Sequence, residues 1–250
     1  MRAAAWAAVA AAALLAGCGG DGGGDSPRLV VSAAASLSDA LGSCSRSFGG
    51  ADVKLSFAGS DELAAQLRRG VKPDVYAAAN TELPEELHRE GLLGTPRGFA
   101  TNELVLAVSE HSGVRSVDDL AKPGVRVAIG SSSVPVGSYT REVLGRLPRA
   151  RTRAILGNVR SNEPDVKGVI GKLSQAAVDA GFVYRSDVTA TGGRLRAIHL
   201  PRELRPMVVY AAGVVKGAGE GQAAGRYVRG LASGRCAAAL RRAGFGPPPG

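Results

Sequence analysis

The sequence is poor in aromatic residues, which form 4% of its 250 residues, although its formal net charge is +9. A surface that binds nucleic acid normally combines basic groups with aromatic side chains that stack on the bases. Here the basic residues are scattered in short groups, such as Arg68-Arg69 and Arg241-Arg242, and no aromatic residues interleave with them. The pattern favours solvated surface charge, and we expect no nucleic-acid partner.

Catalytic signatures are also missing. The three histidines, His88, His111 and His199, lie in polar segments away from any predicted strand–helix junction. The chain has no Gly-x-Ser-x-Gly elbow, no Gly-x-x-x-x-Gly-Lys-[Ser/Thr] loop and no His-Glu-x-x-His pair. We therefore expect no catalytic residue, no cofactor and no direct metal ligand, and we keep a secreted enzyme as the second alternative.

Only three cysteines occur, and the first belongs to a processing signal. Arg2 and an apolar run precede Leu15-Ala16-Gly17-Cys18, which resembles a bacterial lipoprotein signal with residues 1–17 as the signal peptide. The resemblance implies that the Cys18 thiol carries a diacylglycerol. The glycine-rich segment 18–27 then predicts a flexible tether. The folded domain would be lipid-anchored on the outer face of the cell membrane.

The remaining cysteines, Cys44 and Cys236, form a candidate disulfide. An even pair in an exported protein is compatible with a bond. The two residues lie near opposite ends of the chain, so the bond would close a very long loop. Two buried free thiols are the alternative.

Strands and helices alternate in the first third of the chain. Apolar or alternating segments predict three strands, at 28–34, 53–57 and 74–79. Helical periodicity follows each strand, at 36–41, 61–69 and 83–90. This order predicts an α/β fold with a parallel sheet.

A second alternating run lies between two strand-like segments, 104–108 and 208–215. It predicts strands and helices in the order 125–129, 138–147, 165–173 and 181–184, and a last helix follows at 222–242. We expect the chain to leave one lobe for another and return through a two-strand hinge. The predicted parts are lobe 1 (28–107 and 209–246), lobe 2 (108–208) and a frayed tail (247–250).

Serines stand at two of the predicted strand–helix junctions. Ser36 follows the first strand and Ser60 follows the second. A helix N-terminus offers unpaired backbone N–H groups and a positive dipole end, and a serine adds a neutral donor. The two positions therefore indicate an anion site, with simple helix caps as the alternative.

Five segments in order resemble the periplasmic molybdate-binding proteins of bacterial ABC transporters, in a lipoprotein form. They are Val31–Ala40, Ser56–Ser60 with the helix after it, Pro73–Ala79, Val134–Tyr139, and Asp165–Lys167 with Tyr184. The resemblance extends from about residue 29 to 246. It implies a class II periplasmic-binding-protein-like fold that closes on molybdate, and on tungstate as well, and delivers it to a membrane permease and its ATPase. It also implies a monomer.

The resemblance further implies which residues hold the anion. Ser36 and Ser60 would donate hydroxyl groups, Val136 and Val166 backbone N–H groups, and Tyr184 its phenol. The third loop has Val136 where the family usually has alanine. Gly59 and Asp61 stand beside Ser60 where the family often has serines, and we expect the Asp61 side chain to point outward and cap its helix. A receptor of this fold for sulfate, phosphate or another anion is the first alternative, and a lipid-anchored interaction protein is a further one.

Overall fold

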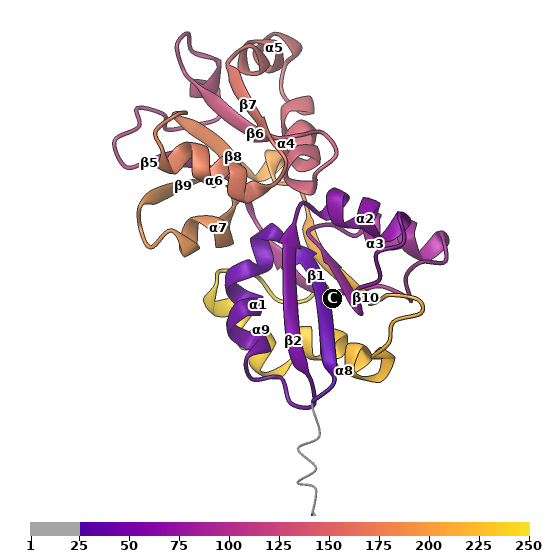
Figure 1. The fold of residues 1–250 in the computed structure, drawn as a ribbon. Coiled ribbons are helices and arrows are strands. Elements are labelled where there is room, and N and C mark those ends of the chain that lie inside the picture. Colours follow the sequence, from indigo (N-terminus) through magenta and orange to yellow (C-terminus); the bar gives the residue numbers. More distant parts are fainter. Residues whose placement is uncertain (1–25) are drawn as a thin grey trace, which may run out of the picture.

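Two lobes make up the chain in the computed structural model, which describes residues 26–250 (Figure 1). The predicted signal peptide 1–17, Cys18 and most of the tether 18–27 lie outside the described residues. Each lobe is built around a five-stranded sheet with helices packed against it. The predicted two-lobe α/β architecture is confirmed.

The sheet of the first lobe has the strand order β2-β1-β3-β10-β4. Its strands are β1 Arg28–Ala34, β2 Asp52–Ala58, β3 Val75–Ala78, β4 Arg97–Asn102 and β10 Val208–Val214. β1, β2 and β3 are parallel, as predicted, whereas β10 is antiparallel to both of its neighbours. The chain returns from the second lobe at the edge where β1–β3 end, so β10 runs back across the sheet.

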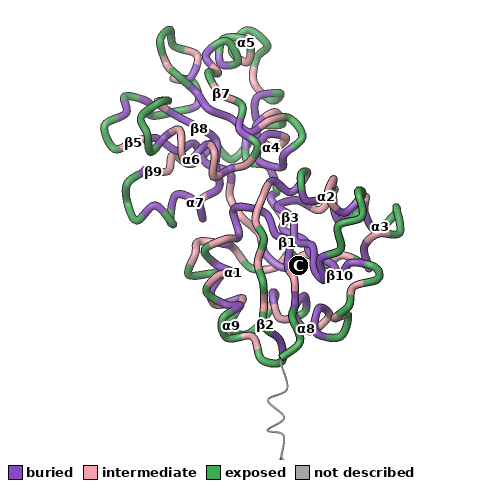
Figure 2. Tube along the Cα trace, in the orientation of Figure 1, coloured by how far each residue is buried: buried purple, intermediate pink, exposed green. Residues whose placement is uncertain are grey.

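Helices cover both faces of this first sheet. Alternation along β3 shows why: Val75 and Ala77 enter the main core, whereas Tyr76 and Ala78 pack into a smaller cluster with leucines of α2 and α3. Burial follows the same pattern in Figure 2, with green on the outer helical faces. The helices of the first lobe are η1 Ala35–Leu37, α1 Ser38–Ser45, α2 Ser60–Arg68, α3 Glu82–Arg89, α8 Gly221–Leu231 and α9 Gly234–Arg242.

The second lobe repeats this design with the strand order β7-β6-β8-β5-β9. Its strands are β5 Leu104–Ser109, β6 Val127–Gly130, β7 Val159–Glu163, β8 Ala180–Tyr184 and β9 Leu195–His199. β6 is parallel to β7 and β8, whereas β5 is antiparallel to β8 and β9. Its helices are η2 Asp118–Ala121, α4 Pro135–Gly145, α5 Arg149–Gly157, α6 Val166–Ser174, α7 Arg185–Ala190 and η3 Arg202–Leu204.

The chain crosses between the lobes twice. The first crossing lies at Glu103, between the last residue of β4 and the first residue of β5. β5 pairs along its whole length with β8 and β9, so it belongs to the second sheet, and the predicted boundary after residue 107 is several residues late. The second crossing is the segment 200–207 before β10. The hinge therefore lies at strand ends.

The predicted last helix, 222–242, is two helices. Ser233 adopts an extended backbone between α8 and α9, and Gly234 has a φ of 57°, so the helix cannot continue through this point. The turn places α9 against α1, where Cys236 forms a disulfide with Cys44 across a Cα–Cα distance of 4.9 Å. The disulfide pairing that the sequence left open is present in the structure.

The C-terminal tail is packed against the first sheet. Thr101 Oγ1 donates to the carbonyl of Pro247 at 2.9 Å, and Pro249 lies beside Gly98 in β4. The prediction that 247–250 is frayed is wrong, because the Pro249 ring and the Pro247 carbonyl both contact β4. Among residues 26–250, no helix has the length and apolar character needed to span a bilayer.

Candidate functional site

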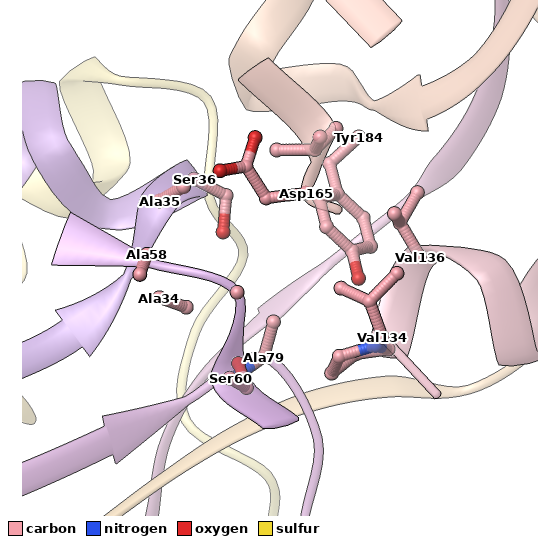
Figure 3. Close-up of a pocket in the computed structure, with 13 residues that line it drawn as sticks. Ala34, Ala35, Ser36, Ala58, Ser60, Ala79, Val134, Val136, Asp165 and Tyr184 are labelled. Atoms are coloured by element: carbon pink, nitrogen blue, oxygen red, sulfur yellow. The ribbon is translucent and has the colours of Figure 1, made fainter. Parts of the chain in front are cut away.

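A small cavity lies between the lobes, where β1, β2 and β3 end and α2, α4 and α6 begin (Figure 3). The space in it for the centre of a water-sized sphere is about 10 Å³, far below the roughly 300–1,000 Å³ of pockets for drug-sized ligands, so the cavity suits a small ligand. Most of the lining is small or apolar: Ala34, Ala35, Ser36, Ala58, Gly59, Ser60, Ala79, Val134, Pro135, Val136, Asp165, Val166 and Tyr184. The structure thus brings all five predicted ligand residues together.

Ser36 lies in the short turn after β1 and is held by a chain of polar groups. Its Oγ is 2.9 Å from Tyr210 Oη, and Asn102 Nδ2 lies 3.5 Å from the same tyrosine oxygen. Asn102 Oδ1 accepts from the Glu103 N–H, which turns the Asn102 amide nitrogen toward Ser186 and Tyr210. With Asn102 donating to Tyr210 and Tyr210 to Ser36, the Ser36 proton is free for a ligand.

Ser60 is the first residue of α2 and is buried. Its Oγ accepts from the Ala79 N–H at 3.2 Å, and its carbonyl accepts from Tyr76 Oη at 2.8 Å. Neither Ser60 nor Ser36 caps a helix, because no side-chain hydrogen bond caps α2 or the turn at Ser36. The helix-cap alternative is therefore wrong. Ser60 keeps its hydroxyl proton available to the cavity.

The second lobe presents the starts of two helices. Val136 follows Pro135 at the beginning of α4, and Val166 is the first residue of α6. Backbone N–H groups in a first helical turn have no intrahelical acceptor and lie at the positive end of the helix dipole. Asp165 fixes the start of α6 by accepting from the Gly168 N–H at 2.9 Å. The contribution expected of Val136 is its backbone N–H, which alanine and valine supply alike.

Tyr184, the last residue of β8, contributes the phenol. Its side chain is buried, and its hydroxyl has no hydrogen-bond partner among the described residues. Figure 3 shows this hydroxyl directed into the cavity beside Val134 and Val136. Burial, with a smaller effect of Tyr210, raises the pKa of Tyr184 well above its ordinary value. The hydroxyl therefore stays protonated at neutral pH and can donate a hydrogen bond to a ligand in the cavity.

The cavity lacks a positively charged side chain among the residues that line it in the described part of the chain. Its one charged residue, Asp165, uses a carboxylate oxygen to cap α6. Within residues 26–250, no group of three His, Cys, Asp or Glu residues is arranged to hold a metal ion. The arrangement can therefore hold an acceptor-rich anion through neutral donors and helix dipoles, each bond to a charged ligand contributing roughly 1.5–3 kcal/mol.

The sequence profile of the bacterial extracellular solute-binding proteins matches residues 29–246. The chain belongs to this family. Among curated relatives, the molybdate-binding protein ModA of Mycobacterium tuberculosis H37Rv is 34% identical over 227 residues, which cover 88% of this chain and 85% of that protein. The resemblance predicted from five short segments is confirmed. The relatives are solute-binding proteins and not enzymes.

Solved solute-binding proteins share the fold. The periplasmic molybdate-binding protein of Azotobacter vinelandii superposes with a TM-score of 0.79, at 22% identity, over 88% of this chain and 100% of that one. The sulfate-binding protein SubI of M. tuberculosis gives a TM-score of 0.75 at 17% identity, over 88% of this chain and 87% of that one. At these identities the likeness shows the fold alone.

Two features of this solute-binding protein were missed or misjudged from its sequence. Gly59 is a point of close approach between the lobes, because a Cβ there would lie 2.6 Å from the carbonyl oxygen of Pro164. Asp61 makes no capping bond, and its buried Oδ1 has no partner beside Gly59, so the prediction of outward capping is wrong.

Proposed function

We propose that this protein is the substrate-binding component of an ABC importer, and that it captures molybdate between its lobes. One observation carries the proposal. Within residues 26–250, two serine hydroxyls, two helix N-termini and a tyrosine hydroxyl without a partner converge on a cavity that no cationic side chain lines. Such a set provides donors for a fully ionised tetrahedral oxyanion. Curated relatives named as molybdate-binding proteins support molybdate as the ligand, with tungstate, of nearly the same size, as a second one.

Cage size is the basis of selectivity in this proposal. Sulfate is smaller than molybdate, so rigid donors fitted to the larger ion would be left with stretched and weakened bonds. Protonated phosphate needs an acceptor, which a ring of donors does not offer. The sulfate receptor remains the second candidate, since a cage of neutral donors suits either dianion and the fold is shared with a sulfate-binding protein.

Delivery and location complete the proposal. A lipid on Cys18 would hold the domain at the outer face of the membrane, where a permease and its ATPase accept the ion from the closed, monomeric receptor. The lipoprotein-like sequence before Cys18 and the glycine-rich segment after it support this arrangement. No enzymatic activity is part of it.

Isothermal titration of the purified protein with molybdate, tungstate, sulfate and phosphate tests the ligand. We expect one-to-one binding of molybdate and tungstate and no heat with the other two. Binding of sulfate in place of molybdate would show that the protein is a sulfate receptor, the second candidate function.

Ser60→Ala tests the site itself. Loss of one charge-assisted bond should weaken molybdate binding about ten- to hundredfold. Ser47→Ala is the matched control, because Ser47 lies in the same lobe, bonds to the Cys44 carbonyl and does not line the cavity. Equal affinity of Ser60→Ala and the parent would contradict the assignment of Ser60.

A further inference from the structure

Lys167 connects the two lobes beside the cavity without lining it. It is the second residue of α6, next to Val166, and its Nζ donates to Asp39 Oδ2 at 3.0 Å. Asp39 is the second residue of α1 in the first lobe. Among residues 26–250, this is the one ion pair that joins the lobes; the others lie within a lobe or at the hinge around Glu103.

A second acidic residue, Asp187 of the same lobe, also contacts Lys167. Asp187 on α7 lies in the same lobe, with Oδ1 3.4 Å from the lysine nitrogen, and its side chain has no exposure to solvent. Burial works to lower the pKa of Lys167, but the nearby charges of Asp187 and Asp39 outweigh it and raise the pKa. The ammonium is therefore charged, and it stands between the acidic side chain of Asp187, fixed in its own lobe, and the carboxylate of Asp39 in the opposite lobe.

Opening of the lobes would affect these two contacts differently. The Asp187 contact lies within the second lobe and survives any rigid-body motion, whereas the Asp39 contact exists only while the lobes are together. A contact made in one state only shifts the equilibrium toward that state by its own free energy. Asp187 is thus a partner of Lys167 in both states, whereas Asp39 is a partner only in the closed state.

We propose that Lys167 is a positioning residue that stabilises the closed, anion-holding arrangement by pairing with Asp39, without itself contacting the anion. This inference rests on the proposed function, because it assumes a ligand that the closed lobes enclose. A rival explanation is that Lys167 simply attracts the anion through its charge. The two differ in sign at Asp39: removal of that negative charge would tighten binding by attraction alone, but would weaken binding if the pair holds the lobes closed.

Asp39→Asn is the decisive variant. The Asp39 side chain is 59% exposed, so the change leaves Lys167 paired with Asp187 and uncovers no buried charge. A pair of this exposure should contribute about a two- to fivefold change in molybdate affinity. We expect that loss as faster dissociation with an unchanged association rate, and we expect it to shrink in 0.5 M salt as screening increases.

The matched control is Asp52→Asn, which removes the same charge from the same lobe. Asp52 is 56% exposed and pairs with Lys54 inside that lobe, so affinity should stay at the parent value. In a double-mutant cycle with Lys167→Met, Asp39→Asn should have no further effect.

If Asp39→Asn binds molybdate as tightly as the parent or more tightly, the proposed role of the Lys167–Asp39 pair is wrong. If the parent binds sulfate and not molybdate, the proposed ligand is wrong, and the role of the Lys167–Asp39 pair is tested with sulfate in the same way. A parent that binds none of the four oxyanions overturns both proposals.

Discussion

Asp187 is an acidic residue near the cleft whose charge state depends strongly on its surroundings. Its carboxylate is fully buried, and neither oxygen has a hydrogen-bond partner of good geometry among the described residues. Burial raises the pKa of Asp187 from 3.8 to about 7, against the opposing effect of Lys167. Between about pH 4 and pH 7 the folded protein therefore carries a proton that the unfolded chain has lost. Through this residue, stability falls as the pH rises across that window.

Asp187→Asn should remove this dependence. The amide keeps the shape of the protonated acid and cannot ionise, and Lys167 retains Asp39 as a partner. We expect the free energy of unfolding of the parent to fall relative to the variant between pH 4 and pH 7, by roughly 4 kcal/mol at most. Urea unfolding of both proteins at several pH values measures the difference. Parallel curves across the window would show that Asp187 is ionised throughout.

Whether a site residue could be predicted from the sequence depends on how far away its partners lie along the chain. Ser36, Ser60 and Tyr184 could be identified because each stands in a short segment that resembles a known family. Tyr210 and Asn102, which orient Ser36, stand in unremarkable strand segments and meet it only through the fold. No local pattern marks a residue whose role depends on a partner 108 or 174 positions away.

At the scale of elements, the disulfide joins two helices from opposite ends of the first lobe. Cys44 on α1 and Cys236 on α9 are separated by 192 residues, so the bond restricts the unfolded chain strongly. The double change Cys44→Ala and Cys236→Ala should lower the free energy of unfolding by about 2–4 kcal/mol. Neither cysteine lines the cavity, so molybdate affinity should change little.

Reductant supplies the control for this prediction. It should destabilise the parent and leave the double variant unaffected. A variant as stable as the oxidised parent would mean that the bond adds nothing to α1–α9 packing.

Elements with strong apolar patterns were predictable, and polar ones were not. β1, β3 and β8 are almost wholly buried, and their apolar runs reveal them. β7 consists of Val-Arg-Ser-Asn-Glu and α5 of Arg-Ala-Arg-Thr-Arg-Ala-Ile-Leu-Gly, so neither shows an apolar periodicity. Both are exposed elements at the edge of the second lobe that tertiary pairing holds in place. β4, β9 and α7 were also missed, because each mixes polar and apolar residues without a clear period.

At the scale of the whole molecule, Gly59 sets how closely the lobes can approach. A methyl group at this position would meet the backbone carbonyl of Pro164 in the opposite lobe, and a backbone cannot move aside as a side chain can. Gly59→Ala should therefore hold the lobes apart and weaken molybdate binding about ten- to hundredfold. Small-angle scattering should show less compaction on ligand addition than in the parent.

Gly42→Ala is the control for the closure prediction. A Cβ at Gly42, in helix α1 of the same lobe, would meet no atom within 4 Å. This variant should bind and compact like the parent. Full compaction and parent-like affinity of Gly59→Ala would mean that the lobes do not need this contact to enclose the anion.

Lobe membership was predictable because the strand pattern leaves one region and returns to it, but the crossing points were not. Leu104–Ser109 is an apolar strand that could belong to either sheet by sequence alone. Its assignment depends on hydrogen bonds to β8 and β9, which are distant in the chain.

The position of β10 between β3 and β4 also fixes an order of events during synthesis. A chain that has emerged as far as His199 contains every strand of the second sheet, while the first sheet still lacks the strand that separates β3 from β4. The second lobe, although its first strand is synthesised later, is thus the first lobe that can complete its sheet. The N-terminal strands must wait with open edges until Val208–Val214 arrives, so the interval between those moments is when the nascent receptor most needs protection from mispairing.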